Sequence, residues 1–427
     1  MTSPVHPAGK APGLWRHRDF RRLWIGETVS QFGSTISTIA LPLVAILVVH
    51  ATTFEVGLLT ACETAAFLLV GLPAGALVDR MPTRPVLIVG DLVRVLALGS
   101  IPAAYALAML SIGQLYLVAL VVGVATVFFD VAYQSYLPEL IGRADLVNGN
   151  AKLQASESVA QIAGPGLGGL LIQVLTSPYA IIVDAATFLW SAAWIARIRT
   201  RPEPPVRRAG RNLREEIGEG LRFVLGNRLL RPIAMCTGVS NLFSSIGGAV
   251  FLVLLARSLR LSPGLIGALT ATAAIGGVLG SLLAGRIARR IGQGPAIWLP
   301  TLLGGPLAFV QPFVRRDWTL GLLTVSLVFY WAAVVVYNIT QVSFRQALCP
   351  PELLGRMNAT MRFLVWGTLP IGGVIGGALG GWLGVRPTLF IAAVGGALAF
   401  LPVFLSPLRR MRELPVYAET ALQNLVA

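Results

Sequence analysis

Four acidic side chains lie deep within apolar stretches of this sequence, where an unpaired charge is costly. They are Glu27, Glu63, Asp91 and Asp130. A carboxyl group in surroundings of low dielectric holds its proton more tightly than in water, so it can load and release that proton near neutral pH. It can also bind a cationic ligand. These residues therefore indicate proton transfer or the binding of a charged small molecule.

Three of these acids are expected to lie at similar depths. At 1.5 Å per residue along a helix, Glu27, Asp91 and Asp130 lie about 8, 10 and 13 Å from the charged residue that ends their stretch. Arg94, three residues after Asp91, shares its helical face. We predict a network of these four residues, which serves either as a structural ion-pair cluster or as a proton-linked group.

Glu63 stands apart from this network. It lies sixteen residues, or about 24 Å of helix, from Asp79, and no charged partner is close to it in the sequence. We predict that Glu63 takes part in proton coupling or contacts a cationic substrate. Alternatively, its carboxylate faces water near the end of its helix.

The composition indicates which elements carry these groups. Of 427 residues, 55% are hydrophobic and only 12% are charged, and the mean hydropathy is +0.74, whereas soluble proteins average about 25% charged residues. Soluble, disordered and collagen-like proteins are excluded, and an all-α polytopic membrane protein is predicted. Twelve apolar runs are long enough to cross a bilayer: 22–49, 55–78, 85–109, 112–136, 152–176, 178–197, 232–256, 263–286, 295–314, 318–343, 358–383 and 386–406.

The basic side chains are distributed unequally between the loops that join these runs. Of the 34 lysines and arginines, 28 lie in the two ends, the central segment and the loops on the same side, whereas five lie on the other side. Cytoplasmic loops are enriched in basic residues. We therefore predict a multi-pass protein of the cell membrane with both termini in the cytoplasm.

The twelve runs divide into two bundles of six. We predict an N-terminal tail over 1–21, bundles over 22–197 and 232–406, a cytoplasmic linker over 198–231 and a C-terminal tail over 407–427.

The linker begins with a proline-rich stretch and continues with helical periodicity. Asn212 and Glu215 have the spacing of a capping box, and Leu213, Ile217 and Leu221 recur at helical spacing. We predict a short amphipathic helix at the cytoplasmic membrane surface. It serves as a tether between the bundles or, alternatively, in regulation.

The two halves of the chain repeat each other. The hexapeptide at 138–143, Pro-Glu-Leu-Ile-Gly-Arg, recurs with one change at 351–356, and the glycine-rich segment at 164–169 recurs at 376–381. Six-helix halves related about the membrane normal are expected of transporters that rock around a central site. A simple pore or receptor gives no reason for such a duplication.

The loop after the second run has the spacing Gly75-x-x-x-Asp79-Arg80-x-x-x-Arg84. With the twelve runs and the repeat, this loop resembles the signature of the major facilitator superfamily, and the likeness extends over roughly residues 15–410. The bacterial branch of enterobactin-exporter-like and macrolide-efflux-like proteins is the most similar. The resemblance implies that these four residues form a cytoplasmic latch between the halves. Pro82 stands where the family usually has glycine, so the turn of this loop is expected to differ.

The fifth run resembles the family's antiporter signature at Gly164, Pro165, Gly168 and Gly169. Glycines let helices approach closely, and proline bends a helix where its hydrogen bond is lost. The resemblance implies export. The alternative is close packing with no bearing on the direction of transport.

Polar and aromatic side chains, mostly of the second half, predict a cavity for a bulky amphiphilic molecule. Each one taken singly could instead be a packing residue or an aromatic of the membrane interface. The candidates are Gln31, Asn241, Trp331, Tyr337, Asn338, Gln341 and Trp366.

Several chemistries lack the residues they need. The three cysteines are isolated, no histidines have metal-ligand spacing, and neither lysine lies in a phosphate-binding loop. We therefore expect no metal, no cofactor, no enzymatic activity and no nucleotide hydrolysis. The net charge of +15 is spread over short loops and forms no face that could follow phosphates, so no nucleic-acid partner is expected.

These features together predict a proton-coupled secondary transporter. It is expected to act as a monomer in the lipid bilayer and to export a small organic molecule, such as a drug, siderophore or natural product, by alternating access. One alternative is an importer or facilitator of the same fold. Another is a membrane sensor that does not transport.

Overall fold

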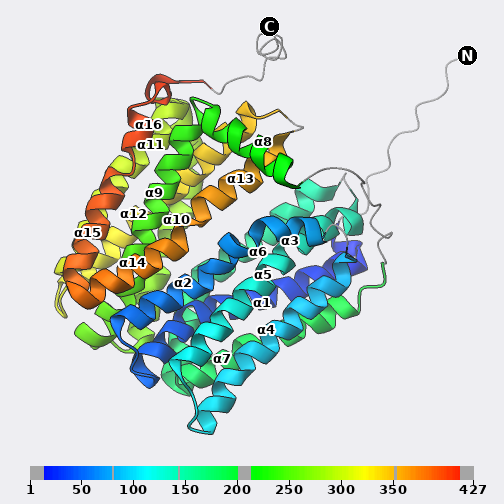
Figure 1. The fold of residues 1–427 in the computed structure, drawn as a ribbon, viewed down its shortest axis with the longest axis vertical. Helices are drawn as coiled ribbons and strands as arrows, with labels where there is room; N and C mark the ends of the chain where they lie inside the picture. The colour runs from blue at the N-terminus through cyan, green and yellow to red at the C-terminus, as the bar shows by residue number, and fades with distance from the viewer. Residues whose placement is uncertain (1–13, 79–80, 143–144, 201–212, 351–352, 414–427) are drawn as a thin grey trace, which may run out of the picture.

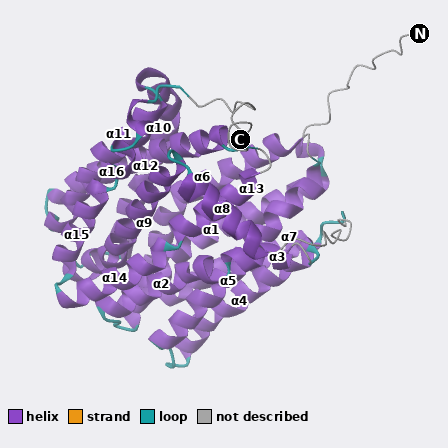
Figure 2. Ribbon diagram, turned by 45° about the horizontal axis from the view of Figure 1, so that its top comes forward, coloured by secondary structure: helices purple, strands orange, loops and turns teal. Residues whose placement is uncertain are grey.

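The computed structural model describes residues 14–78, 81–142, 145–200, 213–350 and 353–413. Within these ranges the chain is almost entirely helical and contains no strand (Figure 2). The predicted all-α class is therefore confirmed. The helices form two groups, one from each half of the chain, which are inclined to each other and meet along one side (Figure 1).

The first group holds six membrane spans, the second of which is broken into two helices. Its helices are α1 (Arg18–Leu43), α2 (Thr53–Leu69), α3 (Gly71–Val78), α4 (Thr83–Ala106), α5 (Ile112–Ile141), α6 (Leu146–Leu175) and α7 (Ser177–Ala196). A π-helical turn, Val44–Val48, extends α1.

The linker helix and the second group follow. They comprise α8 (Leu213–Gly226), α9 (Leu230–Val253), α10 (Pro263–Ile291), α11 (Gln293–Gly304), α12 (Thr319–Leu348), α13 (Leu354–Trp366), α14 (Thr368–Trp382), α15 (Val385–Leu398) and α16 (Leu401–Phe404). A π-helical turn, Leu254–Ser258, extends α9, and 3₁₀ segments follow at Gly305–Phe313 and Pro407–Arg410.

Eleven segments of the described chain are long and apolar enough to cross a membrane. The twelfth span is formed by α2 and α3 together, because each alone is shorter than the thickness of a bilayer requires. All twelve predicted runs thus correspond to helices, with boundaries that shift by a few residues.

Three spans are interrupted where a proline follows, one of them at Leu398, where α15 ends four residues before Pro402. A proline removes an N–H group and its ring clashes with the carbonyl four residues earlier. Pro73 stands four residues after Leu69, where α2 ends, and Pro370 stands four residues after Trp366, where α13 ends. The sequence predicts a continuous helix at each position, whereas the structure shows a break.

The internal repeat is visible in the backbone. The π-helical turns that extend α1 and α9 start 210 residues apart, at Val44 and Leu254. Each is followed by a residue of positive φ at the same offset, His50 at 55° and Arg260 at 49°. Because few non-glycine residues adopt this conformation, its recurrence shows that the two halves share a detailed backbone design.

The twelve spans place the connections on two faces. The linker face carries α8 and the connections α3–α4, α5–α6, α10–α11 and α12–α13. The far face carries the other connections, including residues 49–52 and 259–262. On the linker face the backbone N–H groups of Gln293 and Gly294 donate to Arg412 and Met411, so the end of the second group lies there too.

The linker helix α8 docks on the protein. Val224 is fully buried against Met357 and Met361 of α13, and Glu219 forms an ion pair with Arg356. A Cβ added at Gly220 would lie 2.2 Å from Thr360 Oγ1, so α8 and α13 are in close contact (Figure 1). The predicted helix is present, and its described part packs on α13 through Val224 and Gly220. Asn212 of the predicted capping box lies outside the described residues.

Candidate functional site

On the far face, α2 and α14 bring the two halves together through glycines. A Cβ added at Gly57 would lie 2.4 Å from the Cα of Gly377, and one added at Gly373 would lie 2.9 Å from the backbone nitrogen of Ala61. Such distances leave no room for a side chain. The backbones of the two halves are therefore in direct contact at this end of α2.

A second glycine contact joins α6 and α10. A Cβ added at Gly169 or at Gly267 would lie 2.7 Å from the other residue's Cα, and one added at Gly267 would lie 2.5 Å from the carbonyl oxygen of Pro165. In contrast, Gly164 and Gly168 pack within the first half, against Thr35 and Ile36 of α1. The predicted glycine–proline motif therefore packs on both halves, and α6 continues unbroken through Pro165.

An arginine completes the contact of the halves on the far face. The Arg257 guanidinium, at the end of the seventh span, donates hydrogen bonds to the carbonyls of Ile46 and Ala51 in the first half. Charge-assisted hydrogen bonds of this kind are stronger than neutral ones. Two glycine contacts and this arginine thus hold the halves together on the side opposite α8.

The half of α6 that lies toward the linker face carries a polar stripe. Gln154, Glu157, Ser158 and Gln161 share one helical face, and both glutamines donate to the Glu157 carboxylate at 3.1 Å. Gln154, Ser158 and Gln161 are exposed. Polar side chains facing lipid would be costly, and α6 borders the second half, so this stripe is suited to line a water-filled path between the halves.

Asp91 and Arg94 form a buried ion pair in α4, at 2.7 Å, with side-chain exposures of 0% and 6%. The Arg94 guanidinium lies between two rings, 4.3 Å from the centroid of Phe129 and 4.2 Å from that of Phe188. Cation–π contacts and the carboxylate together compensate the buried charge. This pair is part of the predicted network, and its surroundings are those of a structural element.

We expect Asp91→Asn to destabilise the fold, because it removes the carboxylate that compensates the buried Arg94 charge. The expected loss is about 3–5 kcal/mol, measured as a lower thermal unfolding temperature of the purified protein in detergent. Glu219→Gln is the matched control, because Glu219 is 49% exposed in its pair with Arg356 and such pairs contribute about 0–1 kcal/mol. Equal unfolding temperatures for the two variants would contradict this role.

The other acids of the predicted network have separate partners. Glu27 accepts a hydrogen bond from Gln31 at 2.7 Å, and Asp130 pairs at 3.6 Å with Arg362 of α13, in the other half. Glu27 still interacts electrostatically with Asp91 and Asp130. Within the predicted network only Asp91 and Arg94 are in direct contact, whereas Asp130 pairs with the second half of the protein.

Arg362 is the centre of a contact between the halves that the sequence did not reveal. Its guanidinium lies 4.9 Å from the ring of Trp366 and 5.7 Å from the ring of Phe67, and these two rings meet edge to face at 4.7 Å. The depth of Arg362 within α13 was the available signal, because it lies six residues beyond Arg356, or about 9 Å of helix.

Glu63 lies in α2, one helical turn from Phe67 and on the same face. It is half-buried, and its carboxylate has no hydrogen-bond or ion-pair partner among the described residues. Its backbone packs against α5, where a Cβ added at Gly123 would lie 3.0 Å from the Glu63 carbonyl oxygen. Glu63 is thus an unpaired acid close to the contact formed by Phe67, Arg362 and Trp366.

Asp184 is a further buried acid, and sequence reasoning overlooked it. It is 1% exposed and accepts hydrogen bonds from the hydroxyls of Ser37 and Thr187. Gly33 of α1 allows the approach, because a Cβ there would lie 2.6 Å from Asp184 Oδ1. The signal was available, since Asp184 is an acid within an apolar run.

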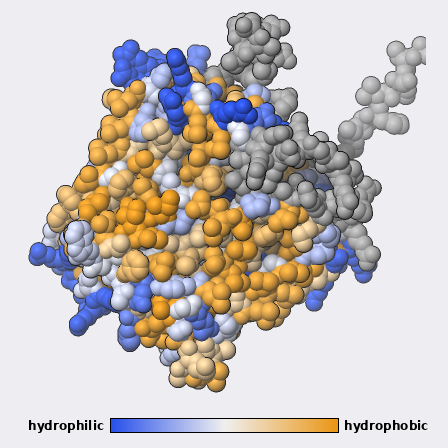
Figure 3. Space-filling view, viewed as in Figure 1, coloured by the Kyte–Doolittle hydropathy of each residue, from blue (hydrophilic) through white to orange (hydrophobic). Residues whose placement is uncertain are grey.

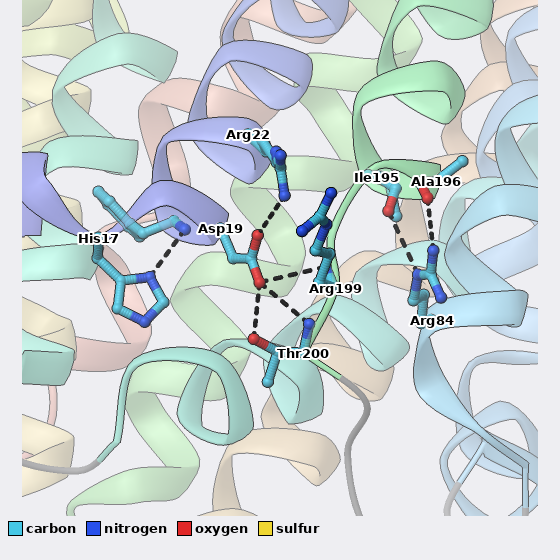
Figure 4. Close-up of polar contacts among 9 residues, drawn as sticks. His17, Asp19, Arg22, Arg84, Ile195, Ala196, Arg199 and Thr200 are labelled. Atoms are coloured by element: carbon cyan, nitrogen blue, oxygen red, sulfur yellow. Dashed lines mark hydrogen bonds and ion pairs between the residues drawn. The ribbon is translucent and has the colours of Figure 1, made fainter.

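The described part of the predicted latch is Arg84, at the start of α4. Its guanidinium donates to the carbonyls of Ile195 (3.3 Å) and Ala196 (2.5 Å) at the end of α7, so it stabilises the first half alone (Figure 4). Asp79 and Arg80 lie outside the described residues, and the surroundings of Gly75 are not described. Pro82 has φ −64°, whereas Gly292, 210 residues later, has φ 93°, so the two loops turn differently.

Asp19 fastens the start of α1 beside this point, although it was not among the predicted residues. It accepts hydrogen bonds from Arg22, from the Thr200 hydroxyl and from the backbone N–H groups of Arg199 and Thr200 (Figure 4). The first residues of α1 are thereby tied to the chain that leaves α7.

Several candidates for the cavity have structural partners. Asn241 and Ser245 of α9 donate to the carbonyls of Val365 and Leu369, beside the break between α13 and α14. Tyr337 is buried and bonds to Thr237.

Three other candidates have a group that is available to a ligand, either an unpaired polar atom or an exposed side chain. Gln341 is buried, and its Oε1 atom has no hydrogen-bond partner. Trp331 and Asn338, seven residues apart on one face of α12, are exposed. Among the described residues, no group of three or more His, Cys, Asp or Glu side chains is placed to hold a metal ion.

Comparisons with known proteins find similar proteins over most of the chain. The model of the Major Facilitator Superfamily matches residues 23–367. Over 409 residues the chain is 26% identical to the enterobactin exporter EntS of Escherichia coli O1:K1, covering 94% of this chain and 95% of that protein. Its identity to the enterobactin exporter of Salmonella choleraesuis is 25%, over 94% of this chain and 96% of that protein.

Solved structures share the fold at low sequence identity. The nucleoside transporter NupG has a TM-score of 0.75 and 13% identity, covering 91% of this chain and 99% of that one. A bacterial homologue of the iron transporter ferroportin in its inward-facing state has a TM-score of 0.74 and 14% identity, covering 91% and 98%. The same homologue in its outward-facing state has a TM-score of 0.61, with 15% identity and the same coverage.

Proposed function

Because the chain belongs to the Major Facilitator Superfamily, we propose that it exports a small organic molecule across the cytoplasmic membrane by alternating access, driven by protons. Both termini and α8 lie on the cytoplasmic side in this proposal, as the distribution of basic residues predicts. The far face is then the external side.

One observation carries the alternating-access proposal: the halves are in backbone contact on the far face, at Gly57–Gly377 and Gly169–Gly267. The polar stripe of α6 lies toward the other face. This combination fits a state closed to the outside and open to the cytoplasm. The higher TM-score to the inward-facing ferroportin homologue, 0.74 against 0.61, supports the same state.

Export is supported by the relatives, which are named as enterobactin exporters at 25–26% identity. The resemblance of the glycine–proline motif of α6 to the family's antiporter signature supports it further, and Pro165 and Gly169 of this motif lie in the contact with α10. This motif therefore stands where the halves must separate when the far face opens.

We place the substrate between the halves, near Phe67, Arg362 and Trp366. Aromatic rings beside the Arg362–Asp130 ion pair suit an amphiphilic molecule, because the rings supply contact area and the charged groups fix its orientation. Exposed Trp331 and Asn338 of α12 are further candidates for the wall of this site.

The proton site is proposed to be Glu63. An acid without a partner in the described structure can accept a proton without breaking an ion pair, whereas Asp91 and Asp130 are held by arginines. Glu63 also lies one turn from Phe67, close enough for its charge to affect a bound substrate. Glu27 and Asp130 would then tune the site electrostatically.

The cytoplasmic latch remains part of the proposal. Asp79 would stabilise the positive end of a helix of the second half when the cytoplasmic side closes. Arg84 would keep the loop in place through its bonds to the end of α7.

Everted membrane vesicles containing the protein test this function. When the interior of the vesicles is more acidic than the medium, we expect a labelled siderophore, macrolide or amphiphilic drug to accumulate inside them. Nigericin, which collapses the pH gradient, should abolish the accumulation. Vesicles without the protein are the control. Uptake that merely equilibrates, regardless of the gradient, would instead support a facilitator. Accumulation in right-side-out vesicles that depends on an external proton excess would support an importer.

A further inference from the structure

A surface cavity of about 440 Å³ lies on the linker face of the second half. It is formed by the residues that precede and begin α9, including Arg228 and Arg231, and by α16 and the residues just after it, including Leu401, Leu405 and Ser406. The cavity is outside the contact between the halves, so it is separate from the proposed substrate site.

Two unpaired positive charges line this cavity. Arg228 and Arg231 are exposed, and neither side chain makes a hydrogen bond or ion pair with a described residue. The lining contains no acidic residue among those described. The Asn227 side chain accepts hydrogen bonds from the N–H groups of Leu229 and Leu230, which fixes the backbone at the start of α9. Both arginine side chains are therefore available to a ligand at a defined position.

The rest of the cavity lining is mostly apolar and lies near the ends of two membrane spans. Met235 lies one turn after Arg231 on the same face of α9 and is 52% exposed, and Leu405 is 74% exposed. Both stand at the ends of membrane spans, Leu230–Ser258 and Val385–Phe404. The surface view shows hydrophilic residues gathered along this edge and a broad hydrophobic surface beneath it (Figure 3).

The charged and apolar parts of the cavity therefore match the two parts of a phospholipid, its head group and its acyl chains. A phosphate binds arginine through paired, charge-assisted hydrogen bonds, and basic pockets at the ends of membrane helices bind acidic head groups. A soluble phosphate compound would make no use of Met235 and Leu405. A zwitterionic lipid would bring its own cation next to two arginines.

We propose that this cavity binds an anionic phospholipid, with its phosphate between Arg228 and Arg231 and its acyl chains along Met235 and Leu405. The lipid would lie between the first and the last span of the second half. It would join the start of α9 to α16, which is only four residues long.

Native mass spectrometry of the full-length protein with phosphatidylglycerol tests this proposal. We expect phosphatidylglycerol bound to the double variant Arg228→Gln/Arg231→Gln to be reduced about fivefold or more relative to the parent protein. This corresponds to a loss of about 1 kcal/mol of binding free energy. The matched control is Arg315→Gln/Arg316→Gln, which removes two adjacent exposed arginines from the far face. The control should retain the lipid. Equal unfolding temperatures in lipid-free detergent establish that both variants are folded.

Three results would overturn the proposal. The first is equal retention by the parent and the Arg228→Gln/Arg231→Gln variant, and the second is equal retention of phosphatidylcholine and phosphatidylglycerol by the parent. The third is displacement of the lipid by millimolar inorganic phosphate, which would mean that the arginines bind phosphate without the acyl chains. Transport activity is not part of this readout, so the lipid site and the proposed export stand or fall separately.

Discussion

Replacing Gly267 with alanine is expected to reduce transport at least about tenfold while leaving the protein folded. The added Cβ would lie 2.5 Å from the carbonyl oxygen of Pro165 and 2.7 Å from the Cα of Gly169. Overpacking of this kind costs about 1–3 kcal/mol, and about 1.4 kcal/mol changes a population tenfold. Because the proposed cycle breaks this contact when the far face opens, the variant should favour the state that is open there.

Two measurements check this expectation. Substrate accumulation in everted vesicles gives the rate, and distances between spin labels at Met109→Cys and Trp318→Cys report the far face, where both side chains are exposed. We expect longer distances in Gly267→Ala. Gly277→Ala is the control on the same helix, because its Cβ would meet only Val335 Cγ2, at 3.9 Å. Parental transport and distances in Gly267→Ala would refute the role of this contact.

Glu63→Gln is expected to uncouple transport from protons. A glutamine keeps the size of the side chain but cannot gain or lose a proton at neutral pH, so accumulation against a gradient should fall at least tenfold, or by about 1.4 kcal/mol of driving force. Exchange of labelled for unlabelled substrate at equal pH should persist, because it needs only the movement of the loaded protein. Proteoliposomes with and without a pH gradient separate the two.

Glu55→Gln is the matched control for this prediction. Glu55 lies eight residues earlier in the same helix, where it forms the capping box with Thr52, and glutamine can replace it there. We expect normal coupling in this variant. If Glu63→Gln retains proton-driven accumulation, the proton is carried by another acid, and Asp184 and Glu27 would be the next to replace.

The arrangement of the spans could be predicted from the sequence because hydrophobic length is a local property. A run of about 20 apolar residues must form a helix in lipid, where every backbone group needs an internal partner. The repeat was also readable, and the matching turns at His50 and Arg260 show that it extends to single backbone angles. The breaks near Pro73 and Pro370 were not predicted, although the prolines that cause them were visible.

The contacts between helices could not be predicted, because they depend on the direction in which each side chain points. Asp130 was placed at a similar depth to Asp91 and Arg94, but the rotation of α5 directs it to Arg362 in the other half. In the same way, the apolar face of the linker helix suits a membrane surface or a protein surface equally well. The structure shows that Val224 of this helix is fully buried in a cluster with Met357 and Met361 of α13.

The most direct test of proton-coupled export is a measurement of proton movement caused by the substrate. Everted vesicles are acidified inside, the pH gradient is followed with a fluorescent dye, and the compound that accumulates in the uptake experiment is added. We predict partial collapse of the gradient in vesicles with the parental protein and none with Glu63→Gln. If the compound is transported while the gradient stays intact, the protein does not exchange its substrate for protons, and the account is contradicted.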